Sequence, residues 1–210
     1  MIEILIADDH AIVRRGLKQI LAETPDIVVA GEATNSRETL EMVQARDWDV
    51  LVLDITMPGR SGLDILKDIR ALRPKLPILV LSMHAEEQFA TRTLKAGANG
   101  YLNKESAPEE LVKAIYKVHS GGKYVSPAQA ERLIGAVTGE QSPLPHEALS
   151  DREFEILRLI ASGKTVSQIA PQLSISVKTV STYRARVLKK MGMKTNAELT
   201  HYAIKAGLVD

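Results

Sequence analysis

The sequence predicts an α/β domain joined to an all-α domain. Over residues 1–120, five short apolar runs alternate with five stretches of helical spacing, a pattern typical of a doubly wound parallel sheet. Residues 148–210 show four helical stretches and no convincing strand. The formal net charge also changes, from −3 over residues 1–120 to +5 over residues 148–210. We therefore expect two domains, separated by a linker over residues 121–147.

The composition is that of an ordinary globular protein, with 45% apolar and 25% charged residues in a chain of 210. No apolar run approaches the ~20 residues that span a bilayer. The N-terminus reaches Asp8 and Asp9 after a short apolar segment, unlike a signal peptide. The absence of cysteine excludes disulfides and thiolate zinc sites. We expect a cytoplasmic protein without a membrane partner.

The strands of the first domain are predicted from uninterrupted apolar runs, which suit strands buried on both faces of a sheet. They cover residues 4–7, 27–30, 50–54, 77–82 and 100–102. Helices are expected over residues 11–21, 35–46, 63–72, 86–96 and 106–120. Two of these helices open with a capping-box pattern, Asn35 with Glu38 and Ser106 with Glu109.

The linker and the second domain contain only helical signals. A helix is expected over residues 127–137 of the linker, and the last helix of the chain over residues 198–206. The other three helices of the second domain begin at Ser150, Thr165 and Ser176. The first two open with a capping-box pattern, Ser150 with Glu153 and Thr165 with Gln168. Pro171 lies inside the helix that follows Thr165. We expect that helix to be kinked or short, because proline removes the hydrogen bond to Ser167.

Polar residues follow four of the five predicted strands. Asp8 and Asp9 follow the first strand, Asp54 ends the third, Ser82 ends the fourth and Lys104 follows the fifth. The carboxyl ends of parallel strands meet at one edge, where open α/β sheets hold their ligands. Asp54 alone could simply cap a turn. Five polar groups reaching one edge indicate a site, because each would otherwise be an unpaired group beside an apolar core.

The acidic residues at this edge suit a hard divalent cation, which takes oxygen ligands. The candidate ligands are the carboxylates of Asp8, Asp9 and Asp54 and the backbone carbonyl of Thr56. A carboxylate can also attack phosphorus and form an aspartyl phosphate. The cation and the ammonium group of Lys104 would then neutralise charge on the phosphoryl oxygens, and Ser82 could donate a hydrogen bond to them.

These residues, together with Met57-Pro58-Gly59, Gly62 and Gly100-Tyr101-Leu102, resemble the response-regulator receiver domain over residues 1 to about 120. The resemblance implies a flavodoxin-like sheet of strand order 2-1-3-4-5. It also implies that a sensor histidine kinase phosphorylates Asp54, and that the chain is no enzyme beyond catalysing its own phosphorylation and dephosphorylation. The implied site residues are Asp8, Asp9, Asp54 and Thr56 for Mg²⁺ or Mn²⁺, Ser82 and Lys104 for the phosphate, Tyr101 as an aromatic switch, and Thr56 and His84 for tuning dephosphorylation. Glu105 stands where many receivers have proline, which puts a cis peptide there in doubt.

The second domain carries a basic segment. Eight bases and no acid lie between Glu155 and Glu198, which suggests a polyanionic partner. Leu149-Ser150, Ile169-Ala170 and Thr179-Val180 help to make this region resemble a LuxR-type helix-turn-helix. A receiver followed by this module is similar to the NarL/FixJ class of response regulators. That resemblance implies binding to double-stranded promoter DNA as a homodimer after activation.

The third helix of this domain is the predicted DNA reader, because Val180, Val187 and Met191 would face the core and leave the opposite side for a major groove. The candidates for base contacts are Ser181, Thr182 and Ala185. The candidates for phosphate contacts are Lys178, Thr179, Tyr183, Arg184, Arg186 and Lys190. Tyr183 stands where the family usually has histidine. A tyrosine at this position resembles the branch represented by GacA, UvrY and BvgA.

Two other functions use the same residues. An aspartate-based phosphatase could use Asp8, Asp9 and Asp54, but such enzymes usually keep the nucleophile and its acid/base on one loop, and Asp54 comes 46 residues after Asp8. Multiple turnover on small phosphate esters would support that function. The second domain could instead bind proteins, which its acid-free basic segment disfavours. A steep salt dependence of DNA affinity would decide in favour of DNA.

Overall fold

The computed structural model describes residues 1–55, 57, 62–82, 86–126, 130, 144–173 and 175–209, with the backbone alone over residues 86–89. The chain divides into two compact units, Met1–Leu133 and Ile134–Asp210. This division falls inside the segment predicted as a linker. The helix predicted over residues 127–137 lies, apart from Ala130, outside the described residues.

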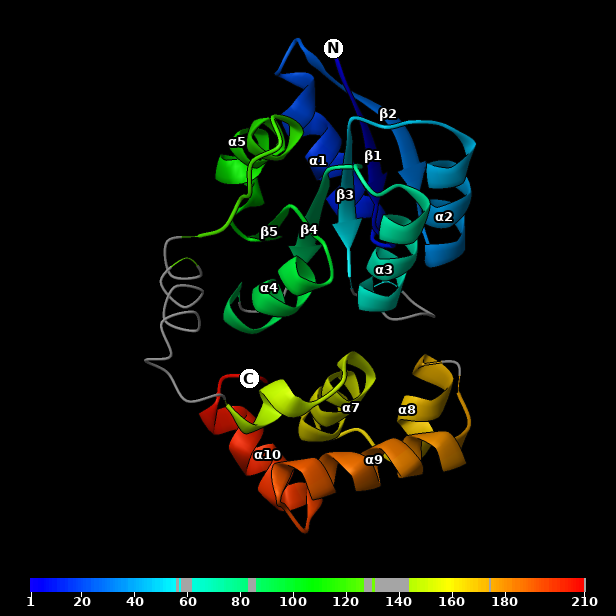
Figure 1. Ribbon diagram of the computed structural model, residues 1–210, viewed down its shortest axis with the longest axis vertical. Helices are drawn as coiled ribbons and strands as arrows, with labels where there is room; N and C mark the ends of the chain where they lie inside the picture. The colour runs from blue at the N-terminus through cyan, green and yellow to red at the C-terminus, as the bar shows by residue number, and fades with distance from the viewer. Residues whose placement is uncertain are drawn as a thin grey trace. The chain divides into compact units, whose positions relative to one another are not determined.

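The first unit is a five-stranded parallel sheet in the order β2-β1-β3-β4-β5, which confirms the predicted fold class (Figure 1). The strands are β1 (Ile2–Ala7), β2 (Ile27–Ala33), β3 (Val50–Asp54), β4 (Ile78–Ser82) and β5 (Gly100–Asn103). The helices are α1 (Ala11–Ala22), α2 (Ser36–Ala45), α3 (Gly62–Leu72), α4 (Glu86–Lys95) and α5 (Ala107–His119). β2 runs three residues past its predicted end. The register shifts between Ile4 and Leu5, and residues 31–33 pair with β1 beyond the shift.

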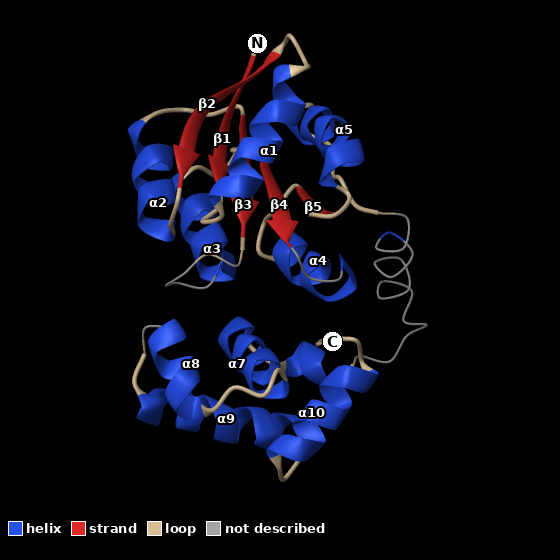
Figure 2. Cartoon of the chain, turned by 180° about the vertical axis from the view of Figure 1, so that it is seen from behind, coloured by secondary structure: helices blue, strands red, loops and turns tan. Residues whose placement is uncertain are grey.

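Alternation along the strands builds two hydrophobic cores, one on each face of the sheet. Leu51 and Leu53 of β3 belong to the core covered by α2, α3 and α4, whereas Val50 and Val52 belong to the core covered by α1 and α5 (Figures 1 and 2). All five residues of β3 are buried. The strand therefore delivers Asp54 to the carboxyl edge of the sheet from a rigid support.

The chain returns to the sheet after α5. Gly100 and Tyr124 form an isolated parallel bridge. The Tyr124 N–H donates to the Asn99 carbonyl at 2.9 Å, and the Tyr101 N–H donates to the Tyr124 carbonyl at 3.1 Å. The Tyr124 hydroxyl also donates to the carboxylate of Glu110 on α5. Tyr124, which lies in the segment predicted as a linker, is thus paired with the last strand of the first unit.

The two predicted capping boxes of this unit differ from expectation. Asn35 does cap α2, accepting from the Glu38 N–H at 3.0 Å, but the Glu38 carboxylate accepts from the N–H of Thr34 at 2.8 Å instead of from Asn35. The box at Ser106 is wrong. Ser106 has φ −87° and ψ −5°, so its backbone is already helical, and its hydroxyl donates to the Asn103 carbonyl at 3.2 Å.

The second unit is all-helical over the described residues. Its elements are η1 (Pro145–Ala148), α7 (Asp151–Ala161), α8 (Val166–Gln172), α9 (Val177–Met191) and α10 (Asn196–Lys205). The capping boxes opened by Ser150 and Thr165 are confirmed, and Ser176 caps α9. Helix α8 has seven residues and ends one residue after Pro171, so it is short as predicted. Helix α10 begins two residues before its predicted start because Thr195 caps it.

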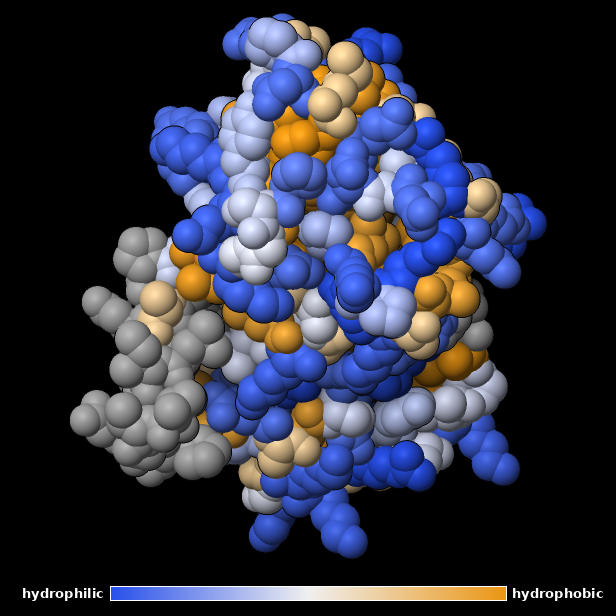
Figure 3. Space-filling view, turned by 45° about the horizontal axis from the view of Figure 1, so that its top comes forward, coloured by the Kyte–Doolittle hydropathy of each residue, from blue (hydrophilic) through white to orange (hydrophobic). Residues whose placement is uncertain are grey.

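The face drawn in Figure 3 is mainly hydrophilic, with smaller hydrophobic patches. Among the described residues, no helix combines the length and the hydropathy that crossing a membrane would take.

Candidate functional site

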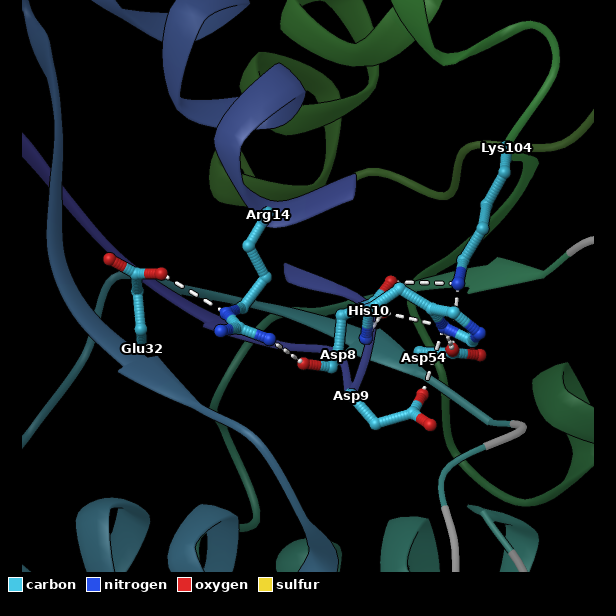
Figure 4. Close-up of polar contacts among 7 residues, drawn as sticks. All are labelled: Asp8, Asp9, His10, Arg14, Glu32, Asp54 and Lys104. Atoms are coloured by element: carbon cyan, nitrogen blue, oxygen red, sulfur yellow. Dashed lines mark hydrogen bonds and ion pairs between the residues drawn. The ribbon is translucent and has the colours of Figure 1, made fainter. Parts of the chain in front are cut away.

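Three carboxylates meet at the carboxyl edge of the sheet. Ala7 of β1 pairs with Leu53 of β3, so Asp8 and Asp54 follow directly from paired positions on adjacent strands. Both side chains are almost completely buried, whereas Asp9 is partly exposed. One ligand atom from each carboxylate and one from His10 lie within 4.8 Å of one another. The sheet register therefore assembles the acidic pocket that the strand ends predicted (Figure 4).

Lys104 closes one side of this pocket. Its Nζ lies 2.7 Å from Oδ2 of Asp8 and 2.6 Å from Oδ2 of Asp54. Its backbone N–H donates to the Ser82 carbonyl at 2.9 Å, which ties the loop after β5 to the end of β4. Burial opposes the charged ammonium group, but the hydrogen bonds and charges of Asp54 and Asp8 outweigh it and raise the pKa of Lys104. Lys104 therefore stays charged beside the acids.

Of the other predicted residues of the pocket, two lie on buried strands and two lie outside the described residues. Ser82 and Tyr101 are buried on the neighbouring strands β4 and β5, and Tyr101 pairs with Val80 in the sheet. The ring of Tyr101 packs into the core covered by α2, α3 and α4. Thr56 and His84 lie outside the described residues.

Sequence reasoning missed three residues that support the pocket. The His10 ring lies over the carboxylates, and Arg14 on α1 donates to the Asp8 carbonyl at 2.7 Å and to Glu32 of β2 at 3.1 Å (Figure 4). Arg14 therefore fixes the backbone from which Asp8 projects. The signal was adjacency: His10 follows the acidic pair directly, and Arg14 comes one helical turn later.

The donor set of the pocket fits a divalent cation. Oδ2 of Asp8 lies 2.7 Å from Nζ of Lys104, whereas the buried Oδ1 of Asp9 accepts no well-formed hydrogen bond, although Nδ1 of His10 lies 3.0 Å away. Buried carboxylate oxygens normally have hydrogen-bond partners or bind a metal. Three carboxylates at one point also repel each other, and a divalent ion relieves that repulsion better than Lys104 alone.

A groove on α9 is the second candidate site. Its lining residues are Lys178, Ser181, Thr182, Ala185, Arg186 and Lys189. All but Lys189 were predicted to contact DNA. Three of these residues, Ser181, Thr182 and Ala185, were predicted to reach base edges, and the other three are basic. The apolar face of the same helix is buried, as predicted, through Val180, Val187 and Met191.

Other predicted DNA contacts on α9 have partners inside the unit. Nε of Arg184 donates to Oδ1 of Asn196 on α10 at 2.6 Å. Nζ of Lys190 lies 2.6 Å from the buried Glu153 of α7. The Thr179 N–H donates to the Ser176 hydroxyl at 3.0 Å, as part of the helix cap. The guanidinium carbon of Arg186 lies over the ring of Tyr183, 5.7 Å from the ring centroid.

Residues 4–116 match the family model described as the response regulator receiver domain. This chain belongs to the response regulator family. The second unit of this response regulator matches the model for bacterial regulatory proteins of the luxR family over residues 147–203. The regulator is thus a receiver joined to a LuxR-type DNA-binding domain, not a metabolic enzyme.

Full-length relatives of this response regulator agree with both matches. The response regulator UvrY of Escherichia coli K12 is 36% identical over 209 residues, 99% of this chain and 96% of UvrY. The response regulator GacA of Pseudomonas aeruginosa PAO1 is 35% identical over 211 residues, 100% of this chain and 99% of GacA. These relatives confirm the predicted GacA/UvrY branch.

A solved relative shows the same combination of domains. RcsB from Salmonella enterica serovar Typhimurium, bound to promoter rprA in the presence of the phosphomimetic BeF3−, is 30% identical with a TM-score of 0.70. The match covers 96% of this response regulator and 97% of RcsB.

Proposed function

We propose that a sensor histidine kinase transfers a phosphoryl group to Asp54, and that this transfer controls promoter binding. The single observation that carries the proposal is the position of Asp54. Its carboxylate is buried at the end of a fully buried strand, between Lys104 at 2.6 Å and the acids that lie between β1 and α1. A carboxylate held this way is an oriented nucleophile beside a preorganised positive charge.

In the proposed step, an Asp54 oxygen bonds to phosphorus while the phosphorus–nitrogen bond of the kinase phosphohistidine breaks. The imidazole leaves with the electron pair of that bond. Asp8, Asp9, Asp54 and the Thr56 carbonyl would hold Mg²⁺ or Mn²⁺, which supplies charge neutralisation for the phosphoryl oxygens. Lys104 holds its proton throughout and pairs with an oxygen of the product. The same pocket would catalyse dephosphorylation, with tuning by Thr56 and His84.

The installed phosphate adds about two negative charges at the sheet edge. Ser82 ends β4 and Lys104 follows β5, so both side chains could turn toward the phosphate. Tyr101, on β5, would then change its position in response to this movement. This change would shift an existing equilibrium toward a homodimer that binds DNA. We propose that the residues lining the α9 groove then enter a major groove of promoter DNA, which also implies a cytoplasmic location.

Labelling of the full chain tests the phosphorylation step. Acetyl phosphate with Mg²⁺ should label the wild type, and Asp54→Asn should remove the label. Asp47→Asn is the matched control, because Asp47 is 91% exposed and pairs with Arg73 instead of Lys104. Undiminished labelling of Asp54→Asn would exclude Asp54 as the acceptor. Sedimentation of the labelled wild type should show a dimer.

DNA affinity measured as a function of salt tests the second step. Each phosphate contact removed should lower the slope of log affinity against log salt by about 0.9. Lys178→Ala and Arg186→Ala should each do so because both line the α9 groove. Lys75→Ala is a matched control in the first unit, since Lys75 is exposed there. Equal slopes for all four proteins would argue against DNA binding through α9.

A further inference from the structure

The histidine beside the acidic pair is turned toward the carboxylates. His10 Nδ1 lies 3.2 Å from Oδ1 of Asp8, 3.0 Å from Oδ1 of Asp9 and 4.0 Å from Oδ2 of Asp54 (Figure 4). The side chain is 56% exposed, so the ring extends to the surface while Nδ1 faces the buried acids. One nitrogen therefore faces the three carboxylates expected to hold a cation.

The three separations fit a single coordination sphere. Two ligands at about 2.1 Å from an ion stand about 3.0 Å apart at right angles and about 4.2 Å apart on opposite sides. The distances from His10 Nδ1 to Asp8 and Asp9 match the first arrangement, and the distance to Asp54 matches the second. Nδ1 is also hydrogen-bonded to Oδ1 of Asp8 at 3.2 Å, a contact that a bound ion would replace.

Helix capping does not explain the histidine. His10 is the N-cap of α1, a position where serine, threonine, aspartate and asparagine stabilise helices best. Its side chain makes no capping hydrogen bond. Its backbone N–H donates to Oδ1 of Asp8 at 2.8 Å, which holds the ring over the pocket. The ring is thus fixed beside the acids without stabilising the end of the helix.

The carboxylates divide between two basic groups. Oδ2 of Asp8 faces Lys104, whereas Oδ1 of Asp8 and Oδ1 of Asp9 face His10. Lys104 occupies the side of the pocket near β5, where the phosphate would bind. The His10 side borders Asp9 and holds a nitrogen instead of a second ammonium group. This leaves the His10 side for a cation.

We infer that His10 Nδ1 is a ligand of the divalent ion in this pocket. An imidazole nitrogen suits transition-metal ions such as Fe²⁺, Ni²⁺ and Zn²⁺, whereas Mg²⁺ prefers oxygen and Mn²⁺ does so less strictly. The site therefore selects a transition-metal ion over Mg²⁺ more strongly than its carboxylates alone would. This inference rests on the proposed function, because it assumes that the pocket holds the ion used with Asp54.

Pulsed electron paramagnetic resonance on Mn²⁺ bound to the full chain tests the inference directly. The wild type should show hyperfine coupling of Mn²⁺ to a directly bound ¹⁴N, and labelling with ¹⁵N-histidine should convert that coupling to ¹⁵N. His10→Ala should still bind Mn²⁺ but lose the coupling. His119→Ala is the matched control, since His119 ends α5 and is exposed. Bound Mn²⁺ without nitrogen coupling in the wild type would overturn the inference.

Metal affinity provides the second measurement. His10→Ala should weaken Mn²⁺ binding by about tenfold or more, as expected when a coordinating group is lost, while Mg²⁺ affinity changes by less than about threefold. Equal losses for both ions, or tighter binding of both by the variant, would also overturn the inference. In the second case His10 would be a basic group that the ion displaces. If Asp54→Asn leaves Mn²⁺ and Mg²⁺ affinities intact, the proposed metal pocket itself is wrong, a failure distinct from the loss of the nitrogen ligand.

Discussion

Nζ of Lys190 lies 2.6 Å from Oε2 of Glu153, which joins the last turn of α9 to the first turn of α7. Lys190 was predicted as a phosphate contact, and Glu153 only as part of a capping box. The pair lies on the side of α9 that faces its own unit, whereas Lys189 lines the groove on the other side. Adjacent lysines of one helix therefore have different tasks.

Lys190→Met should destabilise the second unit by about 1–3 kcal/mol, because it leaves the buried Glu153 carboxylate without its charged partner. Lys189→Met should change stability little, since Lys189 is exposed, but should weaken DNA binding. Amide hydrogen exchange in α7 and α9 of the full chain measures the first effect, and DNA titration the second. Reversed effects of the two substitutions would refute the assignment.

The stability of the second unit should fall in acid because of Glu153. Burial raises the pKa of this carboxyl, but the hydrogen bonds from Lys190 and from the Ser150 N–H outweigh it, so the folded-state pKa lies below its ordinary value of 4.5. A group with a lowered folded pKa stabilises the fold above its unfolded pKa, and this contribution is lost as pH falls through the folded pKa. In the Glu153→Gln variant, the stability of the second unit, measured by amide hydrogen exchange, should fall less steeply below about pH 4.5 than in the wild type. If the variant and the wild type lose stability equally in acid, Glu153 is not the cause of the loss.

Arg70 should be a stability residue of the first unit. Its guanidinium donates to the carbonyls of Pro74 at 2.7 Å, Leu76 at 2.9 Å and Gly97 at 2.6 Å, which joins the loops before β4 and β5. Arg70→Met should cost about 1–3 kcal/mol in urea unfolding, because these carbonyls, two of them in part-buried contacts, lose their donor. Arg37→Met is the control, since the Arg37 side chain is 81% exposed. Equal stability of both variants would contradict this role.

Gly62 should tolerate no side chain. A Cβ at this position would lie 2.3 Å from the Cα and 2.4 Å from the carbonyl oxygen of Ile55, the residue after Asp54. Gly62→Ala should therefore push the backbone next to Asp54 and slow acetyl phosphate labelling as well as lower the melting temperature. Gly16→Ala is the matched control on α1, because nothing lies within 4 Å of a Cβ there. Equal labelling rates for the two variants would show that a side chain at Gly62 does not disturb Asp54.

Much of the fold could be predicted because its signals are local. Apolar runs such as residues 50–54 mark buried parallel strands, and their order follows from the receiver resemblance. The register shift in β2 was not foreseeable, because it depends on pairing with a strand distant in sequence. The cap at Ser106 failed for a different reason: the pattern was present, but the backbone of Ser106 itself already has helical angles.

In the candidate site, too, local signals were predictable and contacts between distant elements were not. Strand ends located the acids and Lys104, because side chains at the carboxyl ends of parallel strands converge. The contacts of Arg14 with Glu32, and of Lys190 with Glu153, could not be predicted, because each joins two elements that are distant in sequence and meet only in the folded chain. Composition identified the basic helix α9. It could not tell which bases line the groove and which have partners inside the unit.

The pairing of Tyr124 with β5 has a consequence for association between molecules. A parallel sheet that ends in β5 would expose unpaired N–H and C=O groups along its rim, a surface that recruits strands from other chains. Tyr124 occupies the Asn99 carbonyl and the Tyr101 N–H on that rim. A receiver cut after residue 120 would lose this cover, and we expect it to aggregate through β5 under conditions in which the intact chain does not.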